Sequence, residues 1–338
     1  MEKIAVNRLP HKILVIKPSS LGDVVHSLPV LSALNECFPL ANIHWVIAKG
    51  LEGLLEGNPM ISKLWIIDKD KWKNAARLCS TLAELGGLAA GIRKEAYDIA
   101  IDLQGLMRSG LIAAATGAPV RIGFAEAREG SPIFYTHKIT GGKDVHAVDR
   151  YLKVAEALGC NIGEVKFPLP LVREPENVMK LKDKLGDYVV LVPGARWQTK
   201  KWPAEQFAAL ALKLPLKSVI LGSAADRETA KAIENQTKGK ATSLAGETNI
   251  VELIWIIRSA KLVITNDSGP MHIAAACGIP VVAIFGPTNP IRTGPYGNRN
   301  IVVRSSLGCA PCYRRKCRSI KCMNDMTAEM VFREIGNL

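Results

Sequence analysis

Residues 13–26 have the sequence ILVIKPSSLGDVVH, in which a β-branched apolar run leads through a Gly-containing turn into a helical pattern. The apolar run predicts a buried strand, and Gly22 permits a tight turn after it. The first turn of the following helix has free backbone N–H groups, which can bind an anion. A strand that leads directly into a helix is typical of parallel α/β sheets, which bind ligands at the carboxyl ends of their strands. Residues 17–23 therefore form the first candidate site.

The same alternation of strand and helix patterns recurs along the chain. Apolar runs predict strands at residues 13–16, 44–47, 64–67 and 99–103, and again at 189–192, 218–221, 262–265 and 281–285. Helical spacing predicts helices at residues 24–37, 71–94, 204–213, 226–237 and 250–259. Pro29 predicts a kink or a late start in the first helix. A last helix, capped by Thr327, is expected to present on one side Met330, Val331, Ile335 and Leu338.

A weakly patterned stretch with three prolines, residues 161–175, separates the two sets of elements and is interpreted as a linker. We predict an N-terminal domain over residues 1–165, a C-terminal domain over residues 176–325 and a C-terminal helix within residues 326–338. The predicted fold class is α/β, with two Rossmann-like parallel sheets that face each other across a cleft. Such a cleft is the expected binding site.

The charge of the chain is locally concentrated. The 338 residues include 44 Lys and Arg against 31 Asp and Glu, a net charge of +13. No acidic residue lies between Asp267 and Asp325, and the basic segment (residues 292–321) has eight of the Lys and Arg residues. An excess of this kind implies an anionic partner, such as nucleic acid, an acidic membrane surface or a phosphorylated ligand. The apolar content of 48% excludes a disordered chain.

Nothing in the sequence predicts export or membrane insertion. Charged residues and Pro10 interrupt residues 1–17, so we do not expect these residues to form a signal peptide. Residues 268–291 have no charged side chain, but residues 278–280, Gly-Ile-Pro, divide them into a short helix and a strand. We expect a cytoplasmic protein whose eight cysteines are reduced.

Asp23 has two interpretations. A carboxylate in the first turn of a helix commonly caps the free N–H groups, and it can instead act as a general base towards a hydroxyl. His26 lies on the same helix face and is a second candidate base. The motifs GxGxxG and GxxxxGK[ST] are absent, which argues against dinucleotide dehydrogenases and P-loop NTPases.

Two further loops follow predicted strands of the second half. Residues 193–203, PGARWQTKKWP, contain three cations, which suit a leaving diphosphate or an ordinary solvated loop. In residues 265–272, TNDSGPMH, the Ser268 and Gly269 amides begin a helix and form an anion site. Asp267 in this loop is either a helix cap or a ligand-binding group. His272 is either a structural or a functional residue. Residues 286–290, GPTNP, follow the next strand.

These motifs, in this order, resemble glycosyltransferase family nine, the lipopolysaccharide heptosyltransferases. The resemblance rests on KPSSLGDVVHSLP at residues 17–29, IDLQGL at 101–106, KKWP at 200–203, NDSGPMH at 266–272 and FGPT at 285–288. It implies a GT-B fold and an inverting, metal-independent transfer of heptose from ADP-heptose to the Kdo-lipid A inner core, at the cytoplasmic face of the inner membrane. Residues 19–26 resemble the form found in heptosyltransferases I. Heptosyltransferase II and a nucleotide-sugar epimerase of the same architecture are alternatives.

The resemblance also implies roles for individual residues. Asp23 matches the general base, and Lys200 matches the lysine that neutralises the leaving diphosphate. Donor-binding positions match Arg196, Asp226, Thr248, Asp267, Ser268, Gly269 and His272. Acceptor-binding positions match Lys17, Ser19, Ser20, His26 and Arg128. A Thr-Thr pair of the family is replaced here by Ala195-Arg196.

Four cysteines in the basic segment and just after it have a spacing that resembles a zinc knuckle. Cys309, Cys312, Cys317 and Cys322 either hold a structural zinc ion or are ordinary reduced thiols, and catalysis is not expected to require a cofactor. With Tyr313, this segment also suggests a single-stranded RNA-binding protein as an alternative. That alternative leaves the loop motifs unexplained, so no nucleic-acid partner is expected. We expect the basic segment to face anionic lipid A and the membrane surface.

Overall fold

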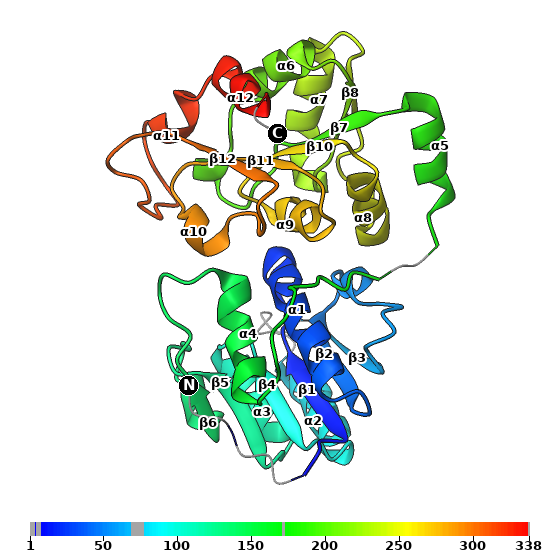
Figure 1. Cartoon of the computed structure of the whole chain (residues 1–338), viewed down its shortest axis with the longest axis vertical. Coiled ribbons are helices and arrows are strands. Elements are labelled where there is room, and N and C mark those ends of the chain that lie inside the picture. Colours follow the sequence, from blue (N-terminus) through cyan, green and yellow to red (C-terminus); the bar gives the residue numbers. More distant parts are fainter. Residues whose placement is uncertain (1–3, 5–7, 69–77, 171–172, 337–338) are drawn as a thin grey trace. The chain divides into compact units, whose positions relative to one another are not determined.

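In the computed structural model, the chain forms two α/β units that divide after residue 171, inside the stretch predicted as a linker (Figure 1). The structure describes residues 4, 8–68, 78–170 and 173–336, with the side chains of residues 78–84 excepted. Within these ranges, no helix is both long enough and apolar enough to cross a membrane.

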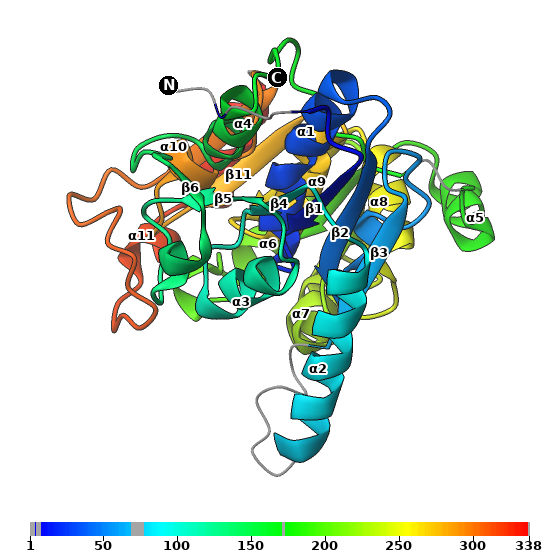
Figure 2. The same cartoon turned by 90° about the horizontal axis from the view of Figure 1, so that it is seen from below.

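The first unit is built on a six-stranded parallel sheet with the order β3-β2-β1-β4-β5-β6. Its strands are β1 (Lys12–Ile16), β2 (Asn42–Ala48), β3 (Lys63–Ile67), β4 (Ile99–Asp102), β5 (Val120–Phe124) and β6 (His137–Ile139). Its helices are α1 (Leu21–Cys37), α2 (Leu78–Lys94), α3 (Met107–Ala115) and α4 (Ala147–Ala157). Helices α1 and α4 pack together on one face of the sheet, and α2 and α3 cover the other (Figure 2). Residues 13–16 of β1 are fully buried, because a strand covered on both faces must be apolar throughout.

The second unit has a parallel sheet of the same size with the order β12-β11-β10-β7-β8-β9. Its strands are β7 (Tyr188–Val192), β8 (Lys217–Ile220), β9 (Ala241–Ser243), β10 (Leu262–Asn266), β11 (Val281–Phe285) and β12 (Asn300–Arg304). Its helices are α5 (Glu176–Leu185), α6 (Ala204–Lys213), α7 (Arg227–Gln236), α8 (Ile250–Arg258), α9 (Gly269–Ala276), α10 (Pro290–Thr293), α11 (Lys321–Asn324) and α12 (Ala328–Ile335). Helices α6, α7 and α12 lie on one face and α8 and α9 on the other (Figure 1).

All eight predicted strands are present, with ends within two residues of the predicted ones. The sequence patterns did not predict strands β5, β6, β9 and β12, nor helices α3, α4, α5, α10 and α11. Three of the missed strands, β6, β9 and β12, form sheet edges, where a strand is short and only partly buried. Such strands lack the continuous apolar run that identifies a central strand of a parallel sheet.

The predicted late start of the first helix is wrong. Helix α1 begins at Leu21, and Pro29 lies inside it. The hydrogen bond from Val24 N to Ser20 O (2.8 Å) already closes the first helical turn, and the Asp23 carboxylate accepts from Ser20 N (3.0 Å). Capping by Asp23 therefore stabilises an earlier start than hydrophobic spacing indicated.

The last helix is capped as predicted, and two residues of its predicted set, Val331 and Ile335, pack in the core of the second unit. Thr327 Oγ1 accepts a hydrogen bond from Met330 N (3.2 Å), and Val331 is buried. Met330, from the same predicted set, is 43% exposed. Leu338 lies outside the described residues, as do residues 71–77 of the helix predicted at 71–94.

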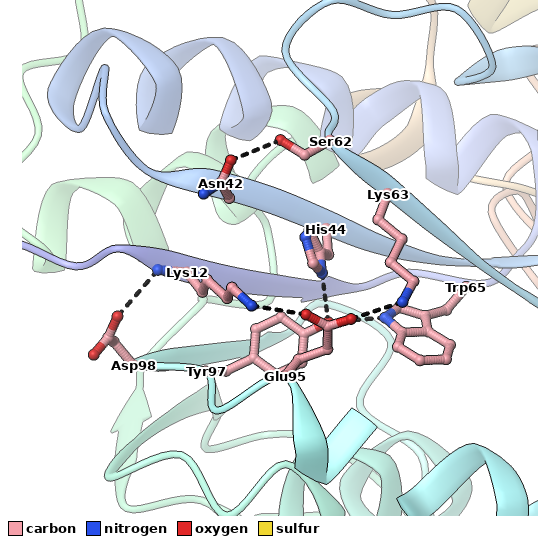
Figure 3. Close-up of polar contacts among 9 residues, drawn as sticks. All are labelled: Lys12, Asn42, His44, Ser62, Lys63, Trp65, Glu95, Tyr97 and Asp98. Carbon is pink, nitrogen blue, oxygen red and sulfur yellow. Dashed lines mark hydrogen bonds and ion pairs between the residues drawn. The ribbon is translucent and has the colours of Figure 1, made fainter. Parts of the chain in front are cut away.

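A salt-bridge network joins three segments of the first unit at the amino edge of its sheet (Figure 3). Glu95, which precedes β4, accepts hydrogen bonds from Lys12 Nζ of β1 (2.8 Å) and from Lys63 Nζ of β3 (2.7 Å). Nearby, the Tyr97 hydroxyl accepts from Trp65 Nε1 (2.8 Å) and contacts Nδ1 of the buried His44 (2.7 Å). Because α/β folds bind ligands at the carboxyl edge, we assign this network a structural role.

The network predicts an acid-sensitive contribution to stability. Hydrogen bonds from Lys12 and Lys63 lower the pKa of Glu95 from 4.5 to about 2. A carboxyl group whose folded-state pKa is lowered stabilises the fold above its unfolded pKa, and the stabilisation is lost as the pH falls towards the folded value. We expect Glu95→Gln to lower the unfolding free energy at pH 7 by about 1 kcal/mol, as measured by urea denaturation.

The difference in unfolding free energy between Glu95→Gln and the unsubstituted protein should become smaller as the pH falls from 4.5 to about 2. Glu36→Gln is the matched control, because Glu36 forms an exposed pair with Lys166, with side chains 54% and 57% exposed. Its effect should stay within about 0.5 kcal/mol. A Glu95→Gln deficit that is the same at pH 7 and pH 3 would contradict the electrostatic origin.

Candidate active site

The loop between β1 and α1 is supported from inside by a buried lysine. Lys17 is 3% exposed, its Nζ donates to Leu103 O (3.1 Å), and it lies 5.0 Å from the ring centre of Tyr151. Burial by itself lowers the pKa of Lys17, but the charges of Tyr151, Asp23 and Asp102 outweigh it and raise that pKa. Lys17 is therefore a charged group beneath the loop. Its predicted contact with an acceptor stays a prediction.

Asp23 lies half-buried in the first turn of α1. Its Oδ2 accepts hydrogen bonds from Ser20 N (3.0 Å) and Ser20 Oγ (2.6 Å). The capping interpretation of Asp23 is thus confirmed, since its carboxylate binds the backbone N–H at the helix start. The general-base role stays a prediction, and the same bonds would orient the carboxylate for it.

Asp102 organises the turn that follows β4. It is fully buried, its Oδ1 accepts from Gln104 N (2.8 Å) and Gly105 N (3.0 Å), and its Oδ2 accepts from the Tyr135 hydroxyl (2.7 Å). Burial raises the pKa of Asp102. Gln104 Oε1 in turn accepts from Ser19 N (3.3 Å) and so joins this turn to the 17–23 loop. No role was predicted for Asp102, although it belongs to the IDLQGL motif at residues 101–106.

Arg128 is exposed and follows β5, at the same sheet edge. Arg128 N donates to Gly105 O (2.9 Å), so the backbone of this loop is held on the turn organised by Asp102. Gly105 has φ +66°, and a Cβ there would lie 3.0 Å from Ala127 Cβ, so this close approach favours glycine. The structure therefore brings the Arg128 loop together with the loop that contains Ser19, Ser20 and Asp23.

His26 lies three residues after Asp23 in α1 and packs against the start of α4. It is 2% exposed, and its ring packs edge-to-face on the ring of His146, which caps α4, with 5.2 Å between ring centres. This contact links the two helices that cover one face of the sheet. His26 as a base or an acceptor-binding residue stays a prediction, with its ring inside the helix pair.

In the second unit, three predicted motifs meet at one carboxylate. Asp267, at the end of β10, pairs through Oδ2 with Lys200 Nζ (2.6 Å), and the same oxygen accepts from Thr288 Oγ1 (2.6 Å). The side chains of Lys200 and Asp267 are only 15% and 7% exposed. Thr288 was part of a quoted motif, but its contact with Asp267 was not predicted. A lysine held in this way presents a positioned charge for an anionic ligand.

Asn266 holds the 193–203 loop against β10. It is fully buried, its Oδ1 accepts from Trp202 N (3.2 Å), and its Nδ2 donates to Pro193 O (2.8 Å). Both ends of the loop that contains Lys200 are therefore attached to one side chain. This role, too, was not predicted, because the three residues are far apart in sequence.

Asp226 lies where the backbone after β7 approaches the loop after β8. Its Oδ1 pairs with Lys201 Nζ (3.2 Å), and its Oδ2 accepts from Ser223 N (3.0 Å) and Ser223 Oγ (2.7 Å). Burial raises the pKa of Asp226, but the bonds from Ser223 and Lys201 outweigh it, so the pKa is lowered. A Cβ on Gly194 would lie 2.5 Å from Asp226 Oδ2, so only glycine permits this approach.

The remaining predicted donor residues lie on loops that follow strands of the same sheet. Arg196 is exposed in the loop after β7, and Thr248 is half-buried after β9, just before the Asn249 cap of α8. Ser268 caps α9, whose first residue is Gly269, and His272 is buried one turn further on. Parallel pairing thus brings the seven predicted donor residues to the carboxyl edge of one sheet.

The four clustered cysteines are free thiols. Among the described residues, no group of three or more His, Cys, Asp or Glu side chains is placed to hold a metal ion. Burial and the charges of Cys312, Cys309 and Cys317 raise the pKa of Cys322. Hydrogen bonds from the backbone of Ile320 and Ser319 lower the pKa of Cys317.

The buried Asn266 predicts a loss of stability when it is replaced. Asn266→Ala leaves Trp202 N and Pro193 O without their partners, and an unsatisfied buried group costs about 1–3 kcal/mol. We expect the unfolding free energy to fall by roughly 2–3 kcal/mol in urea denaturation. Asn300→Ala is the control, because Asn300 Nδ2 also donates to two carbonyls, Tyr296 O (2.9 Å) and Gly297 O (3.2 Å), in a more exposed place. Equal losses in the two variants would contradict the special role of Asn266.

The chain is similar in sequence to a family of known proteins and to several of its members. The model of glycosyltransferase family 9 (heptosyltransferase) matches residues 86–323. Lipopolysaccharide heptosyltransferase 1 of Pseudomonas aeruginosa is 30% identical over 320 residues, which cover 90% of this chain and 87% of that protein. Lipopolysaccharide heptosyltransferase 2 of Salmonella typhimurium is 30% identical over 318 residues, which cover 88% and 89%.

The fold is similar to that of E. coli heptosyltransferase WaaC, solved with ADP-2-deoxy-2-fluoro heptose. The TM-score is 0.79 at 23% identity, over 96% of this chain and 99% of that one. The predicted α/β fold class of GT-B type is thereby confirmed. The extent of the family match and the identity to curated members lead to one conclusion: this chain belongs to glycosyltransferase family 9, the heptosyltransferases.

Proposed function

We propose that this chain transfers a heptose from ADP-heptose to the Kdo-lipid A inner core of lipopolysaccharide, with inversion at the anomeric carbon. The observation that carries the proposal is the contact of Lys200 and Thr288 with Asp267, where three motifs of the family meet at one sheet edge. The proposal is also supported by relatives of this chain, which are lipopolysaccharide heptosyltransferases. One of the similar structures, that of WaaC, was solved with an ADP-heptose analogue.

On the donor side, the proposal assigns the leaving diphosphate to Lys200. Negative charge develops on the diphosphate as the glycosidic bond to ADP breaks, and a positioned cation stabilises it. The N–H groups of Ser268 and Gly269 at the start of α9 add the positive end of a helix dipole. Asp267, released from Lys200 by the incoming anion, binds the heptose. Asp226 binds the ribose hydroxyls.

On the acceptor side, the proposal assigns proton removal to Asp23. The acceptor hydroxyl attacks the anomeric carbon while its proton passes to the Asp23 carboxylate. The charge of Asp23 helps to raise the pKa of Lys17, which therefore lies beneath the loop as a cation. Arg128, exposed at the same sheet edge, binds a carboxylate or phosphate of the acceptor.

A transfer assay with purified protein and ADP-heptose, read by mass spectrometry, tests this function. Kdo-lipid A should gain the mass of one heptose, and the first-heptose specificity further predicts that an acceptor already bearing a heptose reacts more slowly. The opposite preference would identify a heptosyltransferase II. Conversion of the nucleotide sugar without any product on lipid A would instead support the epimerase alternative.

Substitution of Asp23 separates its two roles. Asp23→Asn retains an oxygen that can accept the Ser20 bonds but removes the base, so we expect transfer to fall by about 10²–10⁴-fold. Asp23→Ala should abolish transfer, while ADP binding, measured by calorimetry, stays unchanged in both variants. Near-normal turnover of Asp23→Asn would show that Asp23 serves only as a helix cap.

We also propose that the basic segment contacts the anionic surface of the membrane in which the acceptor lies. The side chains of Lys316, Arg318 and Lys321 are exposed, and each cation near such a surface contributes about 1 kcal/mol to binding. Reversal of these three charges to Glu should reduce co-sedimentation with vesicles that contain anionic lipid. The matched control reverses three exposed lysines elsewhere in the second unit, Lys184, Lys217 and Lys238. Equal vesicle binding by the two triple variants would contradict the proposal.

A further inference from the structure

The middle of the basic segment is attached to two loops of the donor side. Thr199, in the loop that contains Lys200, donates through Oγ1 to Arg314 O (2.8 Å). Tyr313 N donates to Pro287 O (2.8 Å), in the turn that contains Thr288. Two hydrogen bonds therefore hold residues 313 and 314 beside both partners of Asp267, and they determine where the next residue, Arg315, lies.

Arg315 and Lys200 lie over the same aromatic ring. The Trp197 ring centre is 5.0 Å from the Arg315 guanidinium carbon and 4.6 Å from Lys200 Nζ. An indole face attracts cations, and Trp is the most effective side chain for this purpose. Trp197 thus holds in one small region two positive charges that would otherwise repel each other.

The two cations differ in how their charge is balanced. Lys200 has Asp267 as its partner, whereas no carboxylate among the residues that the structure describes forms an ion pair with Arg315. The sequence offers no acidic residue between Asp267 and Asp325. A guanidinium on an aromatic face still has its edge N–H donors, which match the oxygens of a phosphate in a bidentate manner.

We propose that Arg315 is a second phosphate-binding residue of the donor site and binds the diphosphate of the nucleotide sugar together with Lys200. The inference rests on the proposed function, because it uses the same ligand. It also divides the basic segment between two partners, since Arg315 binds the donor and the neighbouring exposed cations contact the membrane.

Calorimetric titration of the full chain with ADP tests the inference. We expect Arg315→Ala to raise the Kd for ADP about tenfold, which corresponds to the loss of one charge-assisted hydrogen bond. Arg315→Lys should recover part of the affinity, since it retains the charge but not the bidentate geometry. The difference in Kd for ADP between Arg315→Ala and the unsubstituted protein should become smaller when the salt concentration is raised from about 0.05 M to about 0.5 M. The melting temperature of Arg315→Ala should equal that of the unsubstituted protein.

The matched control is Arg258→Ala, which removes an arginine that lies 5.2 Å from the ring of Trp255, at the last residue of α8. It should bind ADP like the unsubstituted protein. Unchanged ADP affinity in Arg315→Ala, together with a large loss in Lys200→Ala, would overturn this inference and leave the proposed function standing. If ADP does not bind the unsubstituted protein, or binds equally to all variants, the proposed donor site is wrong and the inference falls with it.

Discussion

Parallel pairing is the constraint on which both candidate clusters depend, because it brings the carboxyl ends of all strands in a sheet to the same edge. In the first unit this edge contains the loops after β1, β4 and β5, and in the second it contains those after β7, β8, β9, β10 and β11. The opposite edge of the first sheet is occupied by the saturated network around Glu95. In the first unit, strand direction thus places the candidate site and this structural network at opposite edges of the sheet.

In each unit, one buried polar side chain fixes the conformation of the loops at the carboxyl edge of the sheet. Asp102 accepts three hydrogen bonds after β4, and Asn266 makes two after β10. A buried polar group must find partners or cost free energy, so each of these residues admits few loop conformations. The exposed, charged residues of the site, such as Arg128, are held through the backbone that these two residues organise.

The Lys and Arg side chains of the candidate site and the basic segment lie in several different environments. Lys17 is buried beneath a loop, Lys200 is paired with Asp267, Arg315 lies on Trp197, and much of the basic segment is exposed. A charge that is buried or paired supports local structure, whereas an exposed cluster acts on partners at longer range. The net charge of the chain does not distinguish these environments, since every Lys and Arg contributes equally to it.

Much of this protein was determined by sequence alone. Eight of the twelve strands, the helix cap at Thr327 and the order of the family motifs follow from local patterns of burial, capping and turn residues. Three of the four edge strands, β6, β9 and β12, were not predicted, because they are short or only partly buried. Tertiary structure decided the roles of Asp102, Asn266 and Thr288, whose partners include residues 33, 64 and 21 positions away in the chain. Only folding brings such residues together, because strand order, and not sequence distance, decides which loops become neighbours.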